Sequence, residues 1–128
     1  AKKLQEGTDV TIVTWGAMCE QCELAVDQMD IEADILDLRS IMPWDKQAVL
    51  GSVQKTNRCL IVHEDTQTAG FGAEISAVLS QEAFKYLDAT IERLTMPDIP
   101  VPYNVDLMDA VLPNVEKITG KLDALLAF

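Results

Sequence analysis

Positive charge is scarce in this sequence of 128 residues: 10 Lys and Arg residues stand against 21 Asp and Glu residues, so the formal net charge is −11. Nucleic acids and anionic membrane surfaces would repel such a chain, and we expect neither as a partner. No apolar run approaches the roughly 18 residues that a membrane span needs, and residues 1–7 lack the hydrophobic segment of a secretion signal. We therefore expect a protein that is neither anchored nor exported, with partners that include basic surfaces.

Several motifs of nucleophilic catalysis and nucleotide binding are also missing. The chain has no G-x-S-x-G nucleophile elbow and no G-x-x-x-x-G-K-[ST] phosphate loop. Gly70 and Gly72 stand without the third glycine of a dinucleotide-binding fingerprint. This glycine pair instead predicts a tight turn and a close approach of the backbone to another domain or subunit.

Cysteine is sparse and odd in number, which argues against a disulfide framework and for a reduced compartment. Cys19 and Cys22 have the C-x-x-C spacing of a redox pair. Cys22 also falls on the apolar stripe of an expected helix over residues 17–29, which predicts a buried and inert thiol. Cys59 lies within an apolar run and His63 is the only histidine, so no zinc site is predicted. The redox pair stays open as an alternative.

Apolar runs and amphipathic segments alternate along the chain. The β-branched and apolar runs predict strands over residues 10–14, 31–36, 59–63 and 89–94. The amphipathic segments predict helices over residues 17–29, 46–55, 70–86, 105–112 and 114–126, with Asp45 and Asn104 as caps. Prolines make residues 96–104 an extended strap. This order predicts one α/β domain over residues 1–128, with three layers and a mainly parallel sheet covered on both faces.

The segment Leu60–Glu74 is the most informative part of the chain. Its pattern predicts a strand with a polar end, then a loop and a helix. Ligand and partner chemistry gathers at the carboxyl ends of parallel strands, so we expect His63, Glu64 and Asp65 at that edge. Arg39 should reach the same edge after the second strand. The residues alone are compatible with a proton-handling cluster and equally with a salt-bridged loop anchor.

Four segments resemble, in the same order, the C-terminal domain of the beta subunit or beta-like half of thiamine diphosphate-dependent 2-oxo acid dehydrogenases: Glu6–Gly16, Asp37–Asp45, His63–Ile75 and Pro97–Pro102. The resemblance covers essentially the whole chain. It implies a transketolase C-terminal-type fold, with a five-stranded, mostly parallel sheet between helices in an α/β/α arrangement. Residues 43–45 and 63–65 look most like the branched-chain (2-oxoisovalerate) type, with the pyruvate and acetoin types as alternatives.

The resemblance implies that this chain is a noncatalytic fragment of a larger decarboxylating enzyme, with no catalytic, cofactor-binding or metal-binding residue of its own. In the family, thiamine diphosphate and magnesium lie between alpha-type and beta-type domains, which are the expected partners. C-terminal domains of the family pack about a twofold axis and help to dock the subunit-binding domain of the dihydrolipoyl acyltransferase. The bacterial cytoplasm or the mitochondrial matrix is the expected compartment.

Interface candidates follow from the sequence and the resemblance together: Arg39, His63, Glu64, Asp65, Gly70, Phe71, Gly72, Asp123 and Phe128. The glycine turn is expected to approach neighbouring domains. The side chain of Asp123 and the chain-end carboxylate at Phe128 are expected to offer negative charge to an Arg or Lys of the acyltransferase. The alternative from another class is a free-standing redox or small-ligand module that uses Cys19 and Cys22.

Overall fold

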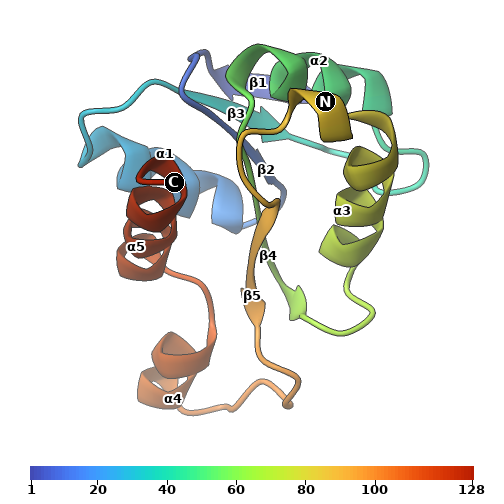
Figure 1. Ribbon diagram of the computed structural model, residues 1–128. Coiled ribbons are helices and arrows are strands. Elements are labelled where there is room, and N and C mark those ends of the chain that lie inside the picture. Colours follow the sequence, from blue (N-terminus) through green and yellow to red (C-terminus); the bar gives the residue numbers. More distant parts are fainter.

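A sheet of five strands lies between two layers of helices in the computed structural model, which describes residues 1–128 (Figure 1). The strands are β1 (Lys2–Gln5), β2 (Val10–Thr14), β3 (Ala33–Asp37), β4 (Cys59–Thr66) and β5 (Glu92–Met96). The helices are α1 (Met18–Asp27), α2 (Lys46–Thr56), α3 (Phe71–Glu82), α4 (Val105–Val111) and α5 (Val115–Leu126), with a 3-10 turn η1 (Phe84–Tyr86). The strand order is β1-β3-β2-β4-β5, and only β1 is antiparallel. The expected α/β architecture is confirmed.

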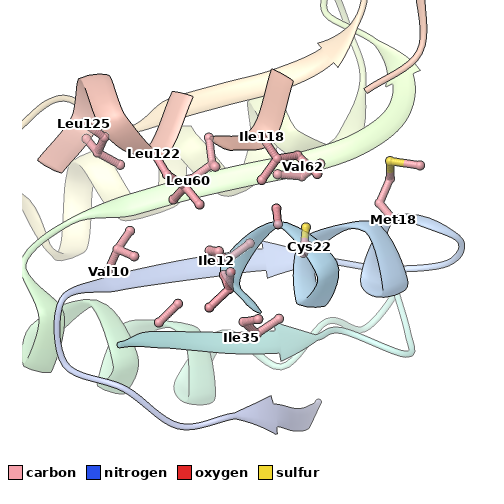
Figure 2. Packing of buried hydrophobic residues seen from close by; sticks show 13 residues of the cluster. Val10, Ile12, Met18, Cys22, Ile35, Leu60, Val62, Ile118, Leu122 and Leu125 are labelled. Atoms are coloured by element: carbon pink, nitrogen blue, oxygen red, sulfur yellow. The ribbon is translucent and has the colours of Figure 1, made fainter. Parts of the chain in front are cut away.

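The two faces of the sheet carry separate apolar clusters, because successive side chains of a strand point to opposite faces. Helices α1 and α5 cover one face (Figure 1), and Leu122 of α5 packs there with Ile12 and Leu60 (Figure 2). Helices α2 and α3 cover the other face, where Val13 and Ile61 belong to the second cluster. Every residue of β2 is buried, which explains why its sequence is β-branched throughout and free of charged residues on both faces.

Strand β1 is the one element that the residue pattern did not predict. Lys2–Gln5 lacks the alternation of a half-buried strand. It pairs with β3. The Nζ atom of Lys3 also forms an ion pair with an oxygen of the buried Asp34 of β3, at 3.2 Å. A tertiary contact, rather than its own hydropathy, therefore holds this edge strand in place.

Three expected boundaries differ from the structure by three residues or more. Strand β4 continues past residue 63 to Thr66, and β5 begins at Glu92 rather than at residue 89. The helix expected over residues 70–86 ends at Glu82, because Ala83 leaves the helical region at φ −120°. The chain then forms the separate turn η1.

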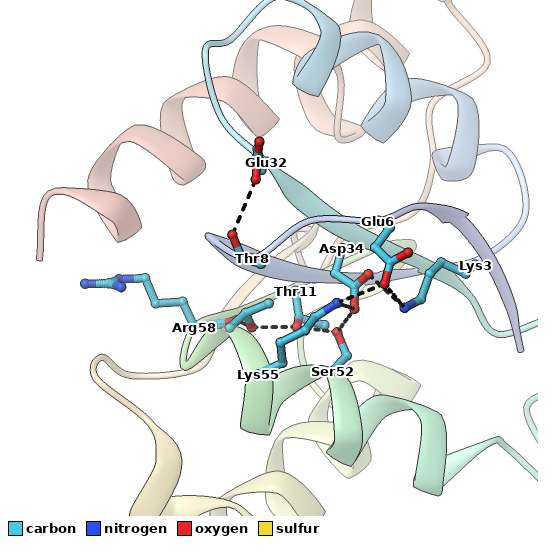
Figure 3. A network of polar contacts seen from close by, with 10 residues as sticks. Lys3, Glu6, Thr8, Thr11, Glu32, Asp34, Ser52, Lys55 and Arg58 are labelled. Atoms are coloured by element: carbon cyan, nitrogen blue, oxygen red, sulfur yellow. Dashed lines mark hydrogen bonds and ion pairs between the residues drawn. The ribbon is translucent and has the colours of Figure 1, made fainter.

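A buried carboxylate joins the edge of the sheet to α2 (Figure 3). The Nζ atoms of Lys3 and Lys55 each lie 3.2 Å from an oxygen of Asp34, and the Ser52 hydroxyl donates a hydrogen bond to the same carboxylate. Thr11 of β2 extends the network through a hydroxyl contact of 2.6 Å with Ser52. Burial alone would raise the pKa of Asp34, but the hydrogen bonds from Ser52 and the two lysines outweigh it and hold that pKa below its ordinary value.

The strap and α4 lie outside the layered body. After β5 the chain runs without helix or strand to residue 104, and α4 stands apart at the end of the sheet where β4 and β5 terminate (Figure 1). The expected cap is confirmed, since the Asn104 side chain accepts hydrogen bonds from the backbone N–H groups of Asp106 and Leu107. No helix of the structure combines the length and the hydropathy that a membrane crossing requires.

Candidate functional site at the carboxyl edge of the sheet

The sheet has its topological switch between β2 and β4, because β3 lies on one side of β2 and β4 on the other. Ligands of open α/β sheets gather at the carboxyl ends of such strands. Here Trp15 follows β2 and stacks on His63 of β4, with ring centroids 5.2 Å apart. The Phe71 ring contacts two tryptophans edge-on, with ring centroids 6.0 Å apart for Trp15 and 6.2 Å apart for Trp44. Aromatic side chains of this chain thus lie at the switch between β2 and β4, and a hollow lined by Trp15, Cys19 and Arg39 lies beside them.

His63 is fully buried and anchors the start of α3. The backbone N–H of Gly72 donates a hydrogen bond to its Nε2 atom at 3.2 Å, while Nδ1 is buried without a hydrogen-bond partner. Since Nε2 accepts, the proton of the neutral ring resides on Nδ1. Burial lowers the pKa of His63 and Arg93 adds to this effect, whereas Asp65 opposes it. The ring is therefore neutral at pH 7 and serves packing.

The glycine turn is shaped by His63 of the same chain. A Cβ atom on Gly72 would collide with the Nε2 atom and would lie 2.7 Å from the Cδ2 atom of that ring. A Cβ atom on Gly70 would collide with the Thr66 carbonyl oxygen and lie 2.9 Å from Cε1 of His63. Contacts within this chain are therefore enough to require glycine at both positions. A role of the outer side of the turn in assembly stays a prediction.

The structure separates the residues that were expected to act together at this edge. Glu64 and Asp65 are exposed, and Asp65 accepts a hydrogen bond from the Thr66 N–H at 2.7 Å. The Arg39 guanidinium pairs with Asp37 at 2.6 Å and not with either carboxylate of β4. Neither the proton-handling cluster nor a salt bridge from Arg39 to β4 forms.

The cysteines have the properties of packed side chains. Cys22 is fully buried, as the helical stripe predicted, and burial raises its pKa to about 12. Burial and the nearby Asp37 raise the pKa of Cys19 to about 11. Only roughly one Cys19 in ten thousand is then a thiolate at pH 7, which disfavours the redox alternative, because the thiolate is the reactive form. No group of three or more His, Cys, Asp or Glu side chains has a metal-binding arrangement.

The remaining candidates lie on α5 and at the chain end. Asp123 is exposed on α5, and Phe128 is 76% exposed. The Phe128 side chain lines a hollow beside β5, together with Phe84 and Ile91. Both positions are accessible to a partner.

The sequence reasoning missed one group of exposed residues. Tyr103, Val105 and Leu107 lie on the strap and α4 with most of their surface open to solvent. The available signal was an apolar segment that contains Asp residues but no Lys or Arg between residues 97 and 116.

Comparison with known proteins places this geometry in a family. The family model of the transketolase C-terminal domain matches residues 1–118. The 2-oxoisovalerate dehydrogenase subunit beta of Pseudomonas aeruginosa is 41% identical over 100 residues, which cover 78% of this chain and 29% of that protein. The pyruvate dehydrogenase E1 component subunit beta of Rickettsia conorii is 42% identical over 120 residues, or 89% of this chain and 36% of that protein. The mitochondrial pyruvate dehydrogenase E1 component subunit beta of Saccharomyces cerevisiae is 38% identical over 132 residues, which cover 99% of this chain and 36% of that protein.

Solved structures share the fold. A split gene transketolase, described as an inactive beta4 tetramer, superimposes with a TM-score of 0.81 and 22% identity over 98% of this chain and 41% of that one. The 2-oxoglutarate:ferredoxin oxidoreductase from Magnetococcus marinus gives a TM-score of 0.64 and 11% identity over 98% of this chain and 19% of that one. The chain spans about a third of the length of the curated relatives it matches. It belongs to the transketolase C-terminal domain family, and its relatives include beta subunits of pyruvate and 2-oxoisovalerate dehydrogenases.

Proposed function

We propose that this chain is the noncatalytic assembly and docking domain of the beta-type component of a 2-oxo acid dehydrogenase, and part of a larger polypeptide. The observation that carries the proposal is 38–42% identity to beta subunits over 78–99% of this chain. The aromatic pair at the switch between β2 and β4 agrees with it, because Trp15 and His63 stack where an open sheet would bind a ligand.

The cofactor of the parent enzyme would be thiamine diphosphate with magnesium, held by alpha-type and beta-type domains outside this chain. The residues present here do not fit the pair. No cluster of three or more potential ligands is arranged for a metal ion, and the switch-point crevice holds aromatic rings instead of a cradle for a pyrophosphate. We assign no step of the decarboxylation to these residues.

The proposed substrate of the parent enzyme is a branched-chain 2-oxo acid, because residues 43–45 and 63–65 have the Pro-Trp-Asp and His-Glu-Asp forms. Pyruvate is the second candidate. The pyruvate dehydrogenase beta subunits cover 89–99% of this chain, against 78% for the 2-oxoisovalerate dehydrogenase subunit of Pseudomonas aeruginosa.

Substrate preference is tested on the natural full-length polypeptide that contains this chain, purified with its alpha-type subunit. Decarboxylation of 3-methyl-2-oxobutanoate and of pyruvate is compared through kcat/KM in the presence of thiamine diphosphate and magnesium. A higher kcat/KM with the branched acid supports the first candidate, and a higher value with pyruvate replaces it by the second. Absence of decarboxylation of either acid contradicts the proposed function.

Docking to the acyltransferase is proposed for the end of α5. Asp123 and Phe128 are exposed, and the chain carries a net charge of −11. Basic residues of the subunit-binding domain would pair with this surface, and added salt would weaken the complex. We expect Asp123→Lys to raise the Kd for that domain, whereas Asp30→Lys, at an exposed site between α1 and β3, should leave it nearly unchanged. Equal effects of the two variants would contradict this docking site.

A further inference from the structure

Exposed apolar side chains concentrate on one short segment. We call residues 97–112, which comprise the strap after β5, helix α4 and Leu112, the arm. Five of the nine large hydrophobic side chains that are exposed in the structure fall within it: Ile99, Val101, Tyr103, Val105 and Leu107. Tyr103 is completely exposed, and α4 contains no buried residue. The apolar surface of the arm therefore contacts little of its own chain.

The arm is nevertheless fixed at both ends. Near its beginning, the Asp98 carboxylate accepts a hydrogen bond from the Thr68 N–H at 2.8 Å, which ties it to the loop after β4. At its end, the Lys117 ammonium of α5 donates to the carbonyl oxygens of Ala110 at 2.7 Å and Leu112 at 2.8 Å. Anchors at both ends lower the entropy that the arm would lose on binding, so it is preorganised for a partner.

Burial within this chain accounts for only part of the apolar surface of α4. A helix of seven residues gains little stability from its own propensity, and most helices in proteins are stabilised by packing of an apolar face. Met108 and Val111 are half-buried, but Val105 is 69% exposed and Leu107 is 57% exposed, so α4 packs only one part of its apolar surface on its own chain. Exposed apolar side chains gathered on one short segment are typical of a protein interaction site.

The charge of the arm identifies the chemistry of the partner. Its charged side chains are Asp98, Asp106 and Asp109, and it has no Lys, Arg or His. Asp98 is engaged with Thr68, which leaves Asp106 and Asp109, one turn apart on α4, open to solvent. An arm-to-arm contact with a second copy of this chain would place these carboxylates against one another with no Lys or Arg of the arm to pair with them. The complementary surface is apolar in the middle and lined by Lys or Arg at the rim.

We propose that the arm docks into an apolar groove with a basic rim on a different subunit of the same enzyme. Tyr103 and Leu107 are the apolar anchors, and Asp106 and Asp109 face the basic rim. This inference rests on the proposed function, since it requires the chain to work in an assembly of unlike subunits. The surface is separate from the one at Asp123 and Phe128.

The test uses the natural full-length polypeptide that contains this chain, titrated with its purified alpha-type subunit. Leu107→Ser on α4 is compared with the matched control Leu24→Ser on α1, which changes a leucine that is 44% exposed on another helix. Removal of a buried apolar anchor should raise the Kd roughly tenfold or more for Leu107→Ser and for Tyr103→Ser, with little effect of Leu24→Ser. The double variant Asp106→Asn, Asp109→Asn should reduce the salt dependence of the Kd.

The urea unfolding midpoint of each variant, measured on the polypeptide alone, distinguishes docking from folding. Unchanged midpoints with weakened binding support the proposal. A lowered midpoint for Leu107→Ser but not for Leu24→Ser would overturn it, because the arm would then pack within its own polypeptide. Loss of self-association with unchanged binding of the alpha-type subunit would make a second copy the occupant and also overturn it. Wild-type binding by both arm variants overturns the docking proposal alone, whereas failure of the wild-type polypeptide to bind the alpha-type subunit overturns the proposed function with it.

Discussion

His63 restricts which residues can occupy positions 70 and 72. Its ring is buried against the turn into α3 and accepts a hydrogen bond from the Gly72 N–H. Gly70 and Gly72 are needed because a Cβ atom at either position would enter the space of the ring or of the Thr66 carbonyl. The glycine pair was visible in the sequence, but the group that it approaches was not, because that depends on how α3 packs on β4.

The first residue-scale prediction concerns Gly72. We expect Gly72→Ala to lower the free energy of unfolding by about 1–3 kcal/mol, the usual range for overpacking a filled site. Gly51→Ala is the matched control, because Gly51 lies in α2 with open space where its Cβ would be. That control should raise the free energy of unfolding by roughly 0.5–1 kcal/mol, since alanine is the better helix former. Urea unfolding measures both changes, and a stabilised Gly72→Ala variant would contradict the packing role of His63.

The second residue-scale prediction concerns pH. Burial depresses the folded-state pKa of His63 below its unfolded value of about 6.5. Below that pH the unfolded chain takes up a proton that the folded chain does not. The free energy of unfolding therefore decreases as the pH is lowered. The slope is at most about 1.4 kcal/mol per pH unit, until the pH reaches the folded-state pKa.

His63→Gln removes this titration while it retains an acceptor for the Gly72 N–H. Urea unfolding at pH 7, 6 and 5 compares the two proteins. We expect the wild-type protein to lose more stability than the variant over this range. Parallel pH profiles would show that His63 does not titrate differently in the folded and unfolded states.

At the scale of elements, β1 and α2 are coupled through one buried carboxylate. Asp34 lies in β3 between Lys3 of β1 and Lys55 of α2 (Figure 3). Hydropathy did not predict β1, because a short edge strand with two lysines has no apolar face. Its position depends on pairing with β3 and on this ion pair, which connect segments more than 30 residues apart.

We expect Asp34→Asn to lower the free energy of unfolding by about 2 kcal/mol at pH 7, because the hydrogen bonds to a charged group are lost. The exposed Asp30→Asn is the control and should change it by less than about 0.5 kcal/mol. Since the folded-state pKa of Asp34 is depressed, its stabilising effect is present above the ordinary carboxyl pKa and is lost as the pH falls through the folded-state value. Urea unfolding at pH 7 measures the difference, and equal effects of the two substitutions would contradict the role of the network.

At the scale of the whole molecule, two apolar clusters share one sheet. Trp15 and Trp44 pack on the cluster under α2 and α3, whereas Leu122 lies in the cluster under α5. The strands are common to both faces, so damage to either cluster should destabilise the whole layered body.

Leu122→Ala tests this coupling. We expect a loss of about 2–5 kcal/mol, as for other buried leucines. The urea midpoint seen by tryptophan fluorescence on the opposite face should fall together with the midpoint seen by far-UV circular dichroism. A fluorescence midpoint that stays at the wild-type value while the dichroism midpoint falls would mean that the two faces unfold independently.

The sequence by itself determined the α/β class, the order of most elements, the Asn104 cap, the burial of Cys22 and the family, because periodicity, capping and motif order are local properties of the chain. Only the tertiary structure decided that His63 is enclosed by its own glycine turn and that Arg39 pairs with Asp37. It also decided the place of β1 and the exposure of the arm. The place of β1 depends on which segments far apart in the sequence meet, whereas the contacts of His63 and Arg39 depend on how the chain turns at the ends of β4 and β3, and hydropathy patterns encode neither.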